Sequence, residues 1–291
     1  MPDPLSAFTE HRDLLFTIAY EMLGSAADAE DVVQETWLRW SDVDHVAVRN
    51  PRAYLASATA RLSLNRLRSL RRSRETYVGQ WLPEPVATAH DVSRDVELAD
   101  ATSYAMLVVL ESLSPTERAV FVMREVFGFE YREIADALEK SEDAVRQIAS
   151  RARTHVRERR EHATVTAAEH AAVSERFFRA AADGDVQQLM DVLAPGVVLL
   201  SDGGGLKTAV LRPIVGIDRV LRFIDGVRPA EEQLRFETRS VNGAPALVIY
   251  IDDVLDTLVS TRVRDGRIAE IYVVRNPHKL ERITRAVPLR R

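Results

Sequence analysis

The 291-residue chain contains no cysteine. This absence excludes disulfides, thiolate metal sites and a cysteine nucleophile. The sequence also has no apolar run that approaches the roughly 18 residues of a membrane-spanning helix. Its first residues, Met-Pro-Asp-Pro, lack the basic and then apolar pattern of a secretory signal peptide. These absences predict a soluble cytoplasmic protein, and the length suits about two domains.

Charge is distributed unevenly along the chain, although the formal net charge is only −5. Residues 61–74 hold six arginines and no acid, and residues 146–160 hold six arginines and one acid. In contrast, residues 28–44 carry six acids and one arginine. Two separate basic segments suit a protein that contacts DNA at two places. The acidic segment requires a different partner.

Residues 129–157 have the pattern of two short helices joined by a tight turn. Ser141 can cap the second helix by accepting a hydrogen bond from a backbone N–H of the first turn. Apolar residues then recur at helical spacing and form an inward face: Val145, Ile148, Ala149, Ala152 and Val156. The opposite face carries residues that can bind base edges or phosphates: Arg146, Gln147, Ser150, Arg151, Thr154 and Arg157. The pattern predicts a helix-turn-helix with 142–157 as its recognition helix, the alternative being an ordinary amphipathic helix pair.

Glu139 occupies the turn position of this motif, which usually holds glycine. A positive φ at Glu139 would cost on the order of 1 kcal/mol, because the side chain crowds the backbone there. We therefore expect a slightly altered turn.

Three helices are predicted before residue 76. The first covers residues 5–23 and ends at Gly24, and Ser25 forms a capping box that starts the second. One face of the second helix groups three polar residues and an exposed leucine: Asp31, Gln34, Glu35 and Leu38. This face is either a docking surface or simply solvated helix. The third helix begins at Pro51.

The third helix runs into the first arginine-rich segment. Four polar residues lie there within two helical turns: Arg61, Asn65, Arg66 and Arg68. They indicate either contacts with DNA or a solubilising helix end, since arginine also suits helix C-termini.

Residues 76–96 contain the sequence Trp-Leu-Pro-Glu-Pro at positions 81–85. Two prolines in three residues prevent a helix and predict an extended linker. A tryptophan is costly to leave exposed in such a linker, so we expect Trp81 to dock elsewhere in the chain. Helical periodicity resumes over 95–112, and Ser114 begins a further helix with a capping box and Pro115 at its first position.

After residue 160 the pattern changes to short strands. Two helices are predicted first, at 168–183 and 185–193. Strands and one further helix follow: strands near 197–201, 210–215, 234–241, 245–251, 257–264 and 268–274, and the helix near 216–226. Asn242-Gly243 and Asp265-Gly266 are strong hairpin turns. The order predicts an α+β domain with a curved antiparallel sheet.

Three segments make the N-terminal half resemble an extracytoplasmic-function sigma factor, the subunit that directs bacterial RNA polymerase to promoters. These segments are residues 28–38, 50–55 and 113–155. The resemblance implies two all-α domains, at 1–75 and 97–160, joined by the 76–96 linker, with the second containing the helix-turn-helix.

The resemblance also implies a role for each polar face. The 28–40 helix is expected to dock on core RNA polymerase through Asp31, Gln34, Glu35 and Leu38. Residues 52–74 are expected to engage the opened −10 element, with Arg61, Asn65, Arg66 and Arg68 as the candidates. The 141–157 helix is expected to read the −35 element. Arg61 and Asn65 stand where many members have Asn and Asp, so the resemblance does not say which −10 bases are read.

Residues 165–285 are similar to the SnoaL-like, ketosteroid-isomerase-like cone domain, which a subgroup of these sigma factors carries. Its members share a Trp-Leu-Pro-Glu-Pro linker, an Asp-Gly-Gly-Gly-Lys motif and an Asn-Pro-Asp-Lys-Leu motif. Here the second motif spans 202–207 with Leu206 inserted, and the third spans 276–280 with His278 in place of Asp. The resemblance implies that the domain regulates the sigma factor in cis.

The regulatory contacts are expected within these three motifs. The candidate residues are Trp81, Pro83, Glu84, Asp202, Gly203, Gly204, Lys207, Asn276, Pro277 and Lys279. Trp81 is expected to supply most of the contact, and Lys207 to form an ion pair with Glu84. Glycines at 203–205 allow close approach of the backbone.

Cone domains also include isomerases and cyclases, which need an acid or base and an oxyanion hole. Residues for such a site exist in the sequence: Asp202, Tyr250, Asp252, Asp253 and Tyr272. Asp202 lies in a glycine-rich loop, however, and the domain's histidines lie at its edges. We therefore expect a promoter-specificity factor that is not an enzyme, with no cofactor or metal, whose partners are core RNA polymerase and promoter DNA. The alternative is a helix-turn-helix regulator fused to a cone domain that binds a small molecule or resembles an isomerase or cyclase.

Overall fold

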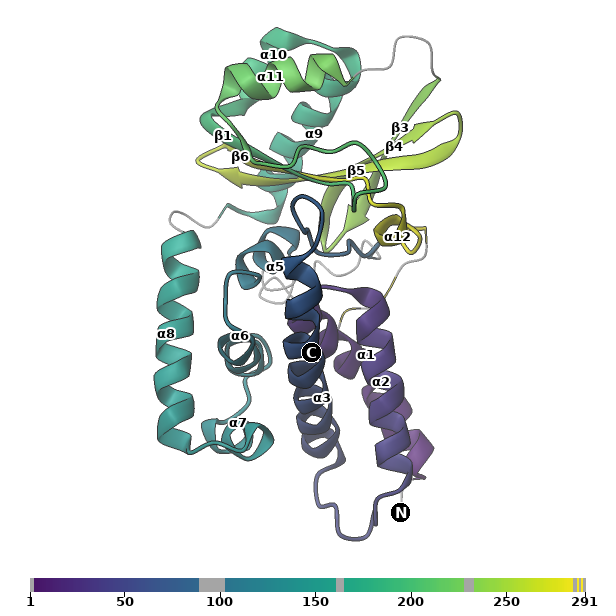
Figure 1. The fold of residues 1–291 in the computed structure, drawn as a ribbon, viewed down its shortest axis with the longest axis vertical. Coiled ribbons are helices and arrows are strands. Elements are labelled where there is room, and N and C mark those ends of the chain that lie inside the picture. Colours follow the sequence, from purple (N-terminus) through teal and green to yellow (C-terminus); the bar gives the residue numbers. More distant parts are fainter. Residues whose placement is uncertain are drawn as a thin grey trace. The chain divides into compact units, whose positions relative to one another are not determined.

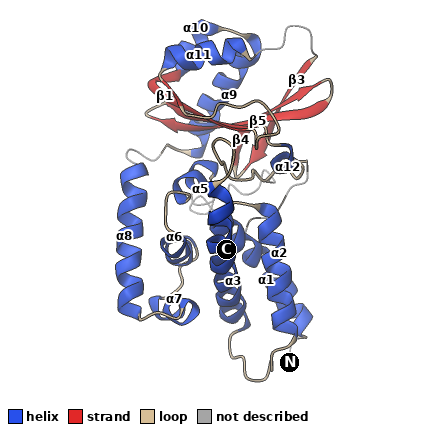
Figure 2. Ribbon diagram, in the orientation of Figure 1, coloured by secondary structure: helices blue, strands red, loops and turns tan. Residues whose placement is uncertain are grey.

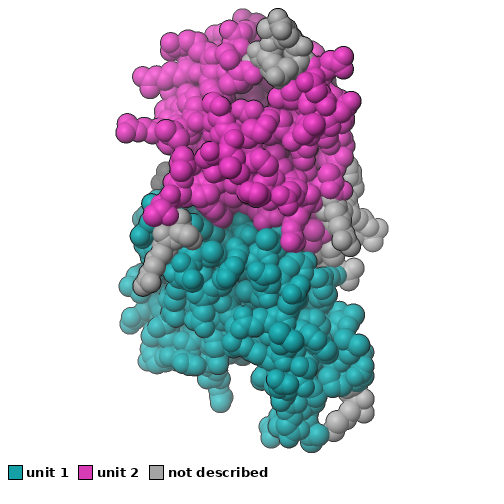
Figure 3. Space-filling view, turned by 45° about the vertical axis from the view of Figure 1, so that its right-hand side comes forward, with its two compact units in different colours: residues 1–75, 106–161, 288–291 teal, residues 76–105, 162–287 magenta. Residues whose placement is uncertain are grey.

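The computed structural model describes residues 3–88, 103–160, 165–227, 233–284, 287 and 289. The chain forms two compact units (Figure 3). Unit 1 comprises residues 1–75, 106–161 and 288–291, and unit 2 comprises residues 76–105 and 162–287. Within the described residues, no helix is both long and apolar enough to cross a membrane.

Unit 1 begins with three helices: α1 (Pro4–Leu23), α2 (Ala26–Ser41) and α3 (Pro51–Glu75). As predicted, α1 ends at Gly24, which is left-handed with φ 64°. Ser25 caps α2 by accepting a hydrogen bond from the Asp28 N–H at 3.2 Å. Trp40 anchors the three-helix core, because its ring is buried and its indole N–H donates to the Pro4 carbonyl at 2.9 Å.

The second half of unit 1 contains the predicted helix-turn-helix (Figure 1). Its elements are α5 (Tyr104–Leu110, which begins in unit 2), α6 (Pro115–Phe121), the π-helical turn η2 (Val122–Val126), α7 (Tyr131–Leu138) and α8 (Glu142–Arg160). Ser114 and Glu117 form the predicted capping box of α6. Glu139 has φ 54°, so the turn uses a left-handed residue without glycine. Of the helix expected over 95–112, residues 95–102 lie outside the described residues.

The described residues of unit 2 form a six-stranded sheet and four helices (Figure 2). The strands are β1 (Leu193–Asp202), β2 (Ile214–Val215), β3 (Leu234–Val241), β4 (Ala244–Ile251), β5 (Val254–Arg264) and β6 (Arg267–Val274). The helices are α9 (Ala167–Asp183), α10 (Val186–Val192), α11 (Ile217–Gly226) and α12 (Pro277–Leu280). The strand order is β2-β1-β6-β5-β4-β3.

Two predictions about the sheet were wrong. The sheet is mixed, because β1 pairs parallel with β6 while the other neighbours pair antiparallel. A parallel pair needs a long crossover, and residues 203–266 supply it. The strand expected over 210–215 is reduced to Ile214–Val215, since Pro213 has no N–H for a ladder. Both predicted hairpin turns are confirmed, with positive φ at Asn242-Gly243 and Asp265-Gly266.

The core of unit 2 lies between one face of the sheet and helices α9, α10 and α11 (Figure 2). Phe177 and Phe178 of α9 pack there against alternate strand residues such as Leu199 and Ile271. Asp202 points to the opposite face of β1 from Leu199 and Ser201. Its buried side chain therefore contacts the segment after α3 and not the apolar core.

Residues 77–88, expected to be a linker, run along unit 2. The Val86 N–H donates to the Asn242 side chain at 3.2 Å, and Asn242 N–H donates back to the Val86 carbonyl at 3.0 Å. Ala87 forms a bridge with Val241 beside this hairpin turn. The segment is thus extended, as its prolines predict, and it is held by backbone hydrogen bonds.

Candidate nucleic-acid interface and the Asp202 junction

Helix α8 presents the predicted polar face. Ser141 accepts a hydrogen bond from the Ala144 N–H at 3.3 Å and so starts the helix. All five residues of the apolar face are buried. All six residues of the polar face are exposed: Arg146, Gln147, Ser150, Arg151, Thr154 and Arg157. Arg146 is partly engaged, since it pairs with Glu142 and stacks 4.6 Å over the Tyr131 ring. The face is therefore open to solvent in unit 1.

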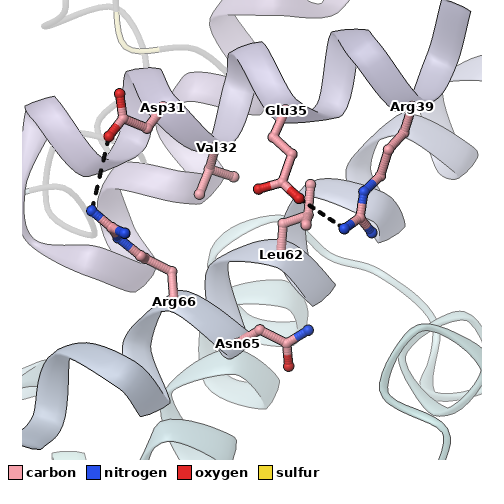
Figure 4. Close-up of a pocket in the computed structure, with 7 residues that line it drawn as sticks. All are labelled: Asp31, Val32, Glu35, Arg39, Leu62, Asn65 and Arg66. Carbon is pink, nitrogen blue, oxygen red and sulfur yellow. Dashed lines mark hydrogen bonds and ion pairs between the residues drawn. The ribbon is translucent and has the colours of Figure 1, made fainter.

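Helix α2 presents the predicted docking face. Its members, Asp31, Gln34, Glu35 and Leu38, are all exposed, and Leu38 is 63% exposed. The two carboxylates have partners inside the protein, since Glu35 pairs with Arg39 at 2.8 Å and Asp31 lies 3.9 Å from Arg66 (Figure 4). An apolar side chain this exposed among acids is a candidate anchor for a partner protein.

A pocket of about 200 Å³ joins the docking face to the candidate −10 residues. Figure 4 shows side chains from α2 and α3 converging on it. Its lining residues are Asp31, Val32, Glu35, Arg39, Leu62, Asn65 and Arg66. Two surfaces that the sequence suggests separately are therefore adjacent.

The four candidate −10 residues differ in how free they are. Arg66 donates to Asp28 at 2.6 Å, and this hydrogen bond raises the Arg66 pKa above its usual value. Arg61 donates to the carbonyl of Ala137 at 3.0 Å and lies 3.6 Å from Glu139, so its guanidinium is occupied by the end of α7. Asn65 and Arg68 are exposed.

In unit 2, the three sequence motifs meet at the carboxylate of Asp202. This side chain is fully buried at the end of β1. One carboxylate oxygen accepts from the Tyr77 hydroxyl at 2.7 Å and from the Gly204 N–H at 2.9 Å. The other accepts from the Leu82 N–H at 2.9 Å and pairs with the Lys279 ammonium at 2.7 Å. We call these five residues the Asp202 junction.

Lys279 completes the junction from the side of α12. Its ammonium also donates to the Leu82 carbonyl, and it lies 4.1 Å from the Trp81 ring and 5.1 Å from the Tyr77 ring. Such cation–π contacts add to the ion pair. Asn276 donates to the Tyr77 hydroxyl at 2.8 Å, and burial together with the Asp202 hydrogen bond raises the Tyr77 pKa.

The glycines of the second motif are needed for close packing. A Cβ at Gly204 would lie 2.6 Å from the Asn276 Cγ, and Gly204 has φ 62°. A Cβ at Gly203 would lie 2.9 Å from the Ala209 Cβ. Any side chain at either position would displace the third motif or the loop itself.

The expected ion pair between Lys207 and Glu84 does not form. Lys207 pairs instead with Asp256 at 3.0 Å, while Glu84 lies 3.9 Å from Arg282. Asp256 is buried and also pairs with Arg275 at 2.9 Å. Burial acts to raise its pKa, but the hydrogen bonds from Thr257 and Lys207 and the charge of Arg275 together lower it below its usual value. Sequence reasoning missed Asp256, because it lies in no motif. Its one signal was an acid within the apolar alternation of β5.

The expected role of Trp81 also needs correction. The Trp81 side chain is half-buried, whereas Leu82 beside it is only 2% exposed. Leu82 therefore supplies the buried apolar contact, and Trp81 covers Lys279. The alternation of the extended segment turns these two neighbours to different sides.

The residues suggested for catalysis do not form a site. Asp252 and Asp253 occupy the exposed β4–β5 turn with positive φ. Tyr250 lies under the Arg235 guanidinium, and Tyr272 donates to Glu270. The Asp202 carboxylate is occupied by four donors. Nothing in this arrangement brings an acid, a base and an oxyanion donor together.

Comparisons with known proteins agree with the helical pattern of unit 1. Residues 7–73 match the sigma-70 region 2 family, and residues 104–156 match the sigma-70 region 4 family. The chain is 35% identical to the ECF RNA polymerase sigma factor SigJ of Mycobacterium tuberculosis, over 94% of this chain and 92% of that protein. It is 32% identical to the probable ECF RNA polymerase sigma factor SigI of the same species, over 96% of each. The crystal structure of the M. tuberculosis SigJ protein superposes with a TM-score of 0.76 at 32% identity, covering 98% of this chain and all of that one.

Proposed function

The chain belongs to the extracytoplasmic-function sigma factors of RNA polymerase, and we propose that its C-terminal unit restrains it in cis through the Asp202 junction. As a sigma factor it directs core RNA polymerase to promoters, so core enzyme and promoter DNA are its partners. We call α1–α3 region 2 and α5–α8 region 4. The proposal includes action in the cytoplasm, where the polymerase works, and no catalytic activity of its own.

The proposal rests on where the connection between the two regions is held. Residues 77–88 are hydrogen-bonded to the sheet part of unit 2: the Leu82 N–H donates to Asp202, and the Val86 N–H donates to Asn242. At the other end of the connection, the Tyr104 hydroxyl donates to the Pro83 carbonyl at 2.7 Å, and its ring packs 5.5 Å from that of Tyr272. Both ends of the connection are therefore held on the same unit.

Holding the connection limits how far apart regions 2 and 4 can move. The −10 and −35 elements are separated by about 25 base pairs, or roughly 85 Å of DNA. Residues 76–103, if fully extended, reach about 95 Å at most, which suffices. While residues 77–88 stay bound and the Tyr104 hydroxyl stays on the Pro83 carbonyl, both ends of the connection stay on unit 2, and the connection cannot extend to that reach. Release of the junction therefore favours simultaneous contact with both elements.

Run-off transcription with core RNA polymerase tests this restraint in the full chain. Lys279→Met removes the cation that joins Asp202, Leu82 and Trp81 while keeping a similar volume. We expect more transcript than from the wild type, and we expect a cysteine pair at 81 and 205 to crosslink less. Arg264→Met, on an exposed arginine of β5, is the control. If both variants give equal amounts of transcript and of crosslink, the C-terminal unit does not restrain the sigma factor through this junction.

We also propose that the exposed face of α8 reads the −35 element. Gln147→Ala and Arg151→Ala should each cost about 1–3 kcal/mol of promoter affinity and relax the base preference, if each side chain binds a base edge. Arg153 is the matched control on the same helix, because it faces Glu125 and Tyr131. Binding assays on promoters with single base changes separate base contacts from phosphate contacts, which would weaken all sequences alike.

The face of α2 is proposed to dock on core polymerase. Reversing the charges of Asp31 and Glu35 together should weaken binding to core enzyme, while the affinity of the free protein for DNA changes little. Glu10→Lys reverses an exposed acid on α1 and serves as the control. Wild-type affinity for core in the double reversal would mean that the face is only solvated.

A further inference from the structure

Glu21 of α1 is a buried carboxyl group where region 2 meets region 4 in unit 1. Its side chain is fully buried, and neither carboxyl oxygen has a hydrogen-bond partner among the described residues. Arg118 of α6 is also buried and donates from Nε to the backbone carbonyl of Glu21 at 2.9 Å. A buried acid that receives no hydrogen bond is costly to ionise.

An ionic cluster surrounds this contact and joins the two regions. Glu111, which follows α5, pairs with both Arg118 of α6 and Arg74 of α3. Arg74 also donates to the Leu23 carbonyl at the end of α1, at 2.6 Å. Helices α1 and α3 of region 2 are thereby fastened to the α5–α6 segment of region 4.

This packed arrangement is incompatible with promoter recognition by both regions at once. Arg61 of α3 contacts the carbonyl end of α7 at 3.0 Å, so the candidate −10 helix touches the helix-turn-helix. The two promoter elements lie roughly 85 Å apart on DNA. Regions 2 and 4 must therefore separate before both are read.

We propose that Glu21 is a proton-dependent latch, whose neutral carboxyl group allows regions 2 and 4 to pack and whose ionisation favours their separation. The inference concerns unit 1 alone and does not depend on the regulatory role of the Asp202 junction.

The charged groups around Glu21 support this assignment. Arg118 faces it from α6, while Arg74 of α3 and Glu111 are engaged with each other, and Asp28 of α2 acts on Arg74. The neighbouring turn η2 presents buried apolar residues, including Val122 and Met123. Burial raises the pKa of Glu21 to about 8, against the opposing charge of Arg118.

The direction of the pH dependence follows from the difference in the Glu21 pKa between the packed and the separated forms. In the separated form Glu21 returns to water, where a glutamate has a pKa of about 4.3. The packed form therefore holds a proton that the separated form releases. The stabilisation of the packed form is complete below the pKa of Glu21 in the separated form. Above that pH, the equilibrium constant for packing falls about tenfold per pH unit until the pH passes 8.

The test compares the full-length wild type with Glu21→Gln, which keeps the shape and cannot ionise. Affinity for core RNA polymerase is measured for both proteins at several pH values from 6 to 7.5. The ratio of the two dissociation constants cancels titrations within the polymerase. Between pH 6 and 7.5 the ratio of the variant's dissociation constant to that of the wild type should grow roughly 25-fold, because only the wild type gains separated form as Glu21 ionises.

A distance measurement checks that the effect arises from separation. The chain has no cysteine, so Ser41→Cys on α2 and Glu158→Cys on α8 accept two dyes without competition. Energy transfer in the wild type should fall as the pH rises, and in Glu21→Gln it should stay constant. Glu10→Gln, an exposed acid on the same helix, should behave as the wild type. A pH-independent affinity ratio would overturn the proposal, and so would equal energy-transfer profiles. Circular dichroism checks that each variant is folded before the measurements are compared.

Discussion

Asp202 and Glu21 are two buried carboxyl groups in one chain, and their surroundings are opposite. Asp202 accepts four hydrogen bonds, one of them from the Lys279 ammonium. Glu21 accepts none from the described residues. Both side chains are fully buried. The difference shows that donors, more than burial, decide whether a buried acid acts as a charged anchor or as a group whose proton is part of the fold.

The two sites also differ in how the sequence encodes them. Three of the four donors to Asp202, Leu82, Gly204 and Lys279, belong to the three short motifs, and the fourth, Tyr77, lies just before the first motif. Glu21 stands in an ordinary helix, and its surroundings come from α3 and α6. The contacts of Asp202 can therefore be traced to short motifs in the sequence, whereas the environment of Glu21 depends on how the helices pack.

The largest effect is expected on removing the charge of Asp202. Asp202→Asn removes the carboxylate that pairs with the buried Lys279 ammonium at 2.7 Å, and breaking such a buried pair costs about 3–5 kcal/mol. Urea unfolding of unit 2, followed by the part of the tryptophan fluorescence that a Trp81→Phe background lacks, measures the loss. Asp265→Asn changes an exposed acid in a turn that asparagine also suits, and it should cost less than about 0.5 kcal/mol. Equal stability of the two variants would mean that Asp202 is not an ionic anchor.

The second effect is a pH dependence in unit 1. Because the folded pKa of Glu21 is raised to about 8, its stabilising contribution is complete below the unfolded value and is lost as the pH rises through 8. The unfolding free energy of the wild type, relative to Glu21→Gln, should fall by about 1.4 kcal/mol per pH unit between pH 5 and 8. A Trp81→Phe background leaves Trp37 and Trp40 as reporters of region 2. If the difference in unfolding free energy does not change with pH, the ionisation of Glu21 does not affect the stability of unit 1.

A smaller effect tests whether Asp202 depends on its glycine-rich loop. Gly204→Ala forces a left-handed alanine and a contact with Asn276, which together cost about 2–3 kcal/mol. Gly196→Ala is the control, because nothing lies within 4 Å of a Cβ there. Thermal unfolding of the two variants compares them directly. Matching transitions would mean that the loop adjusts without strain.

The smallest effect concerns the aromatic cover of Lys279. Trp81→Ala removes a half-buried ring and its cation–π contact, for a loss of about 1–2 kcal/mol. Trp81→Phe keeps an aromatic face and should lose less than half of that. A loss near that of Asp202→Asn would reverse the order proposed here and restore Trp81 as the main anchor.

Much of unit 1 is predictable from sequence because its signals are local. Caps at Ser25, Ser114 and Ser141 and the stop at Gly24 act within one helical turn. Helical spacing also separates the buried and exposed faces of α8 correctly. In unit 2 the same reasoning located most strands and both hairpin turns, since alternation and turn residues are equally local.

Other features depend on pairs far apart in the chain. The parallel pairing of β1 with β6, the partner of Lys207 and the occupation of Arg61 by α7 have no signal within a few residues. Only the folded chain brings Asp256 within 3.0 Å of Lys207, 49 residues away.

The sequence by itself determined the helical caps, the exposed polar face of α8, the extended 77–88 segment and the sigma-factor identity. These depend on residue type and spacing, which act over one or two turns. The tertiary structure alone decided that Asp202 receives four donors and that Glu21 receives none from the described residues. The charge state of a buried acid depends on donors and dielectric supplied by elements distant in the chain. No local pattern contains that information.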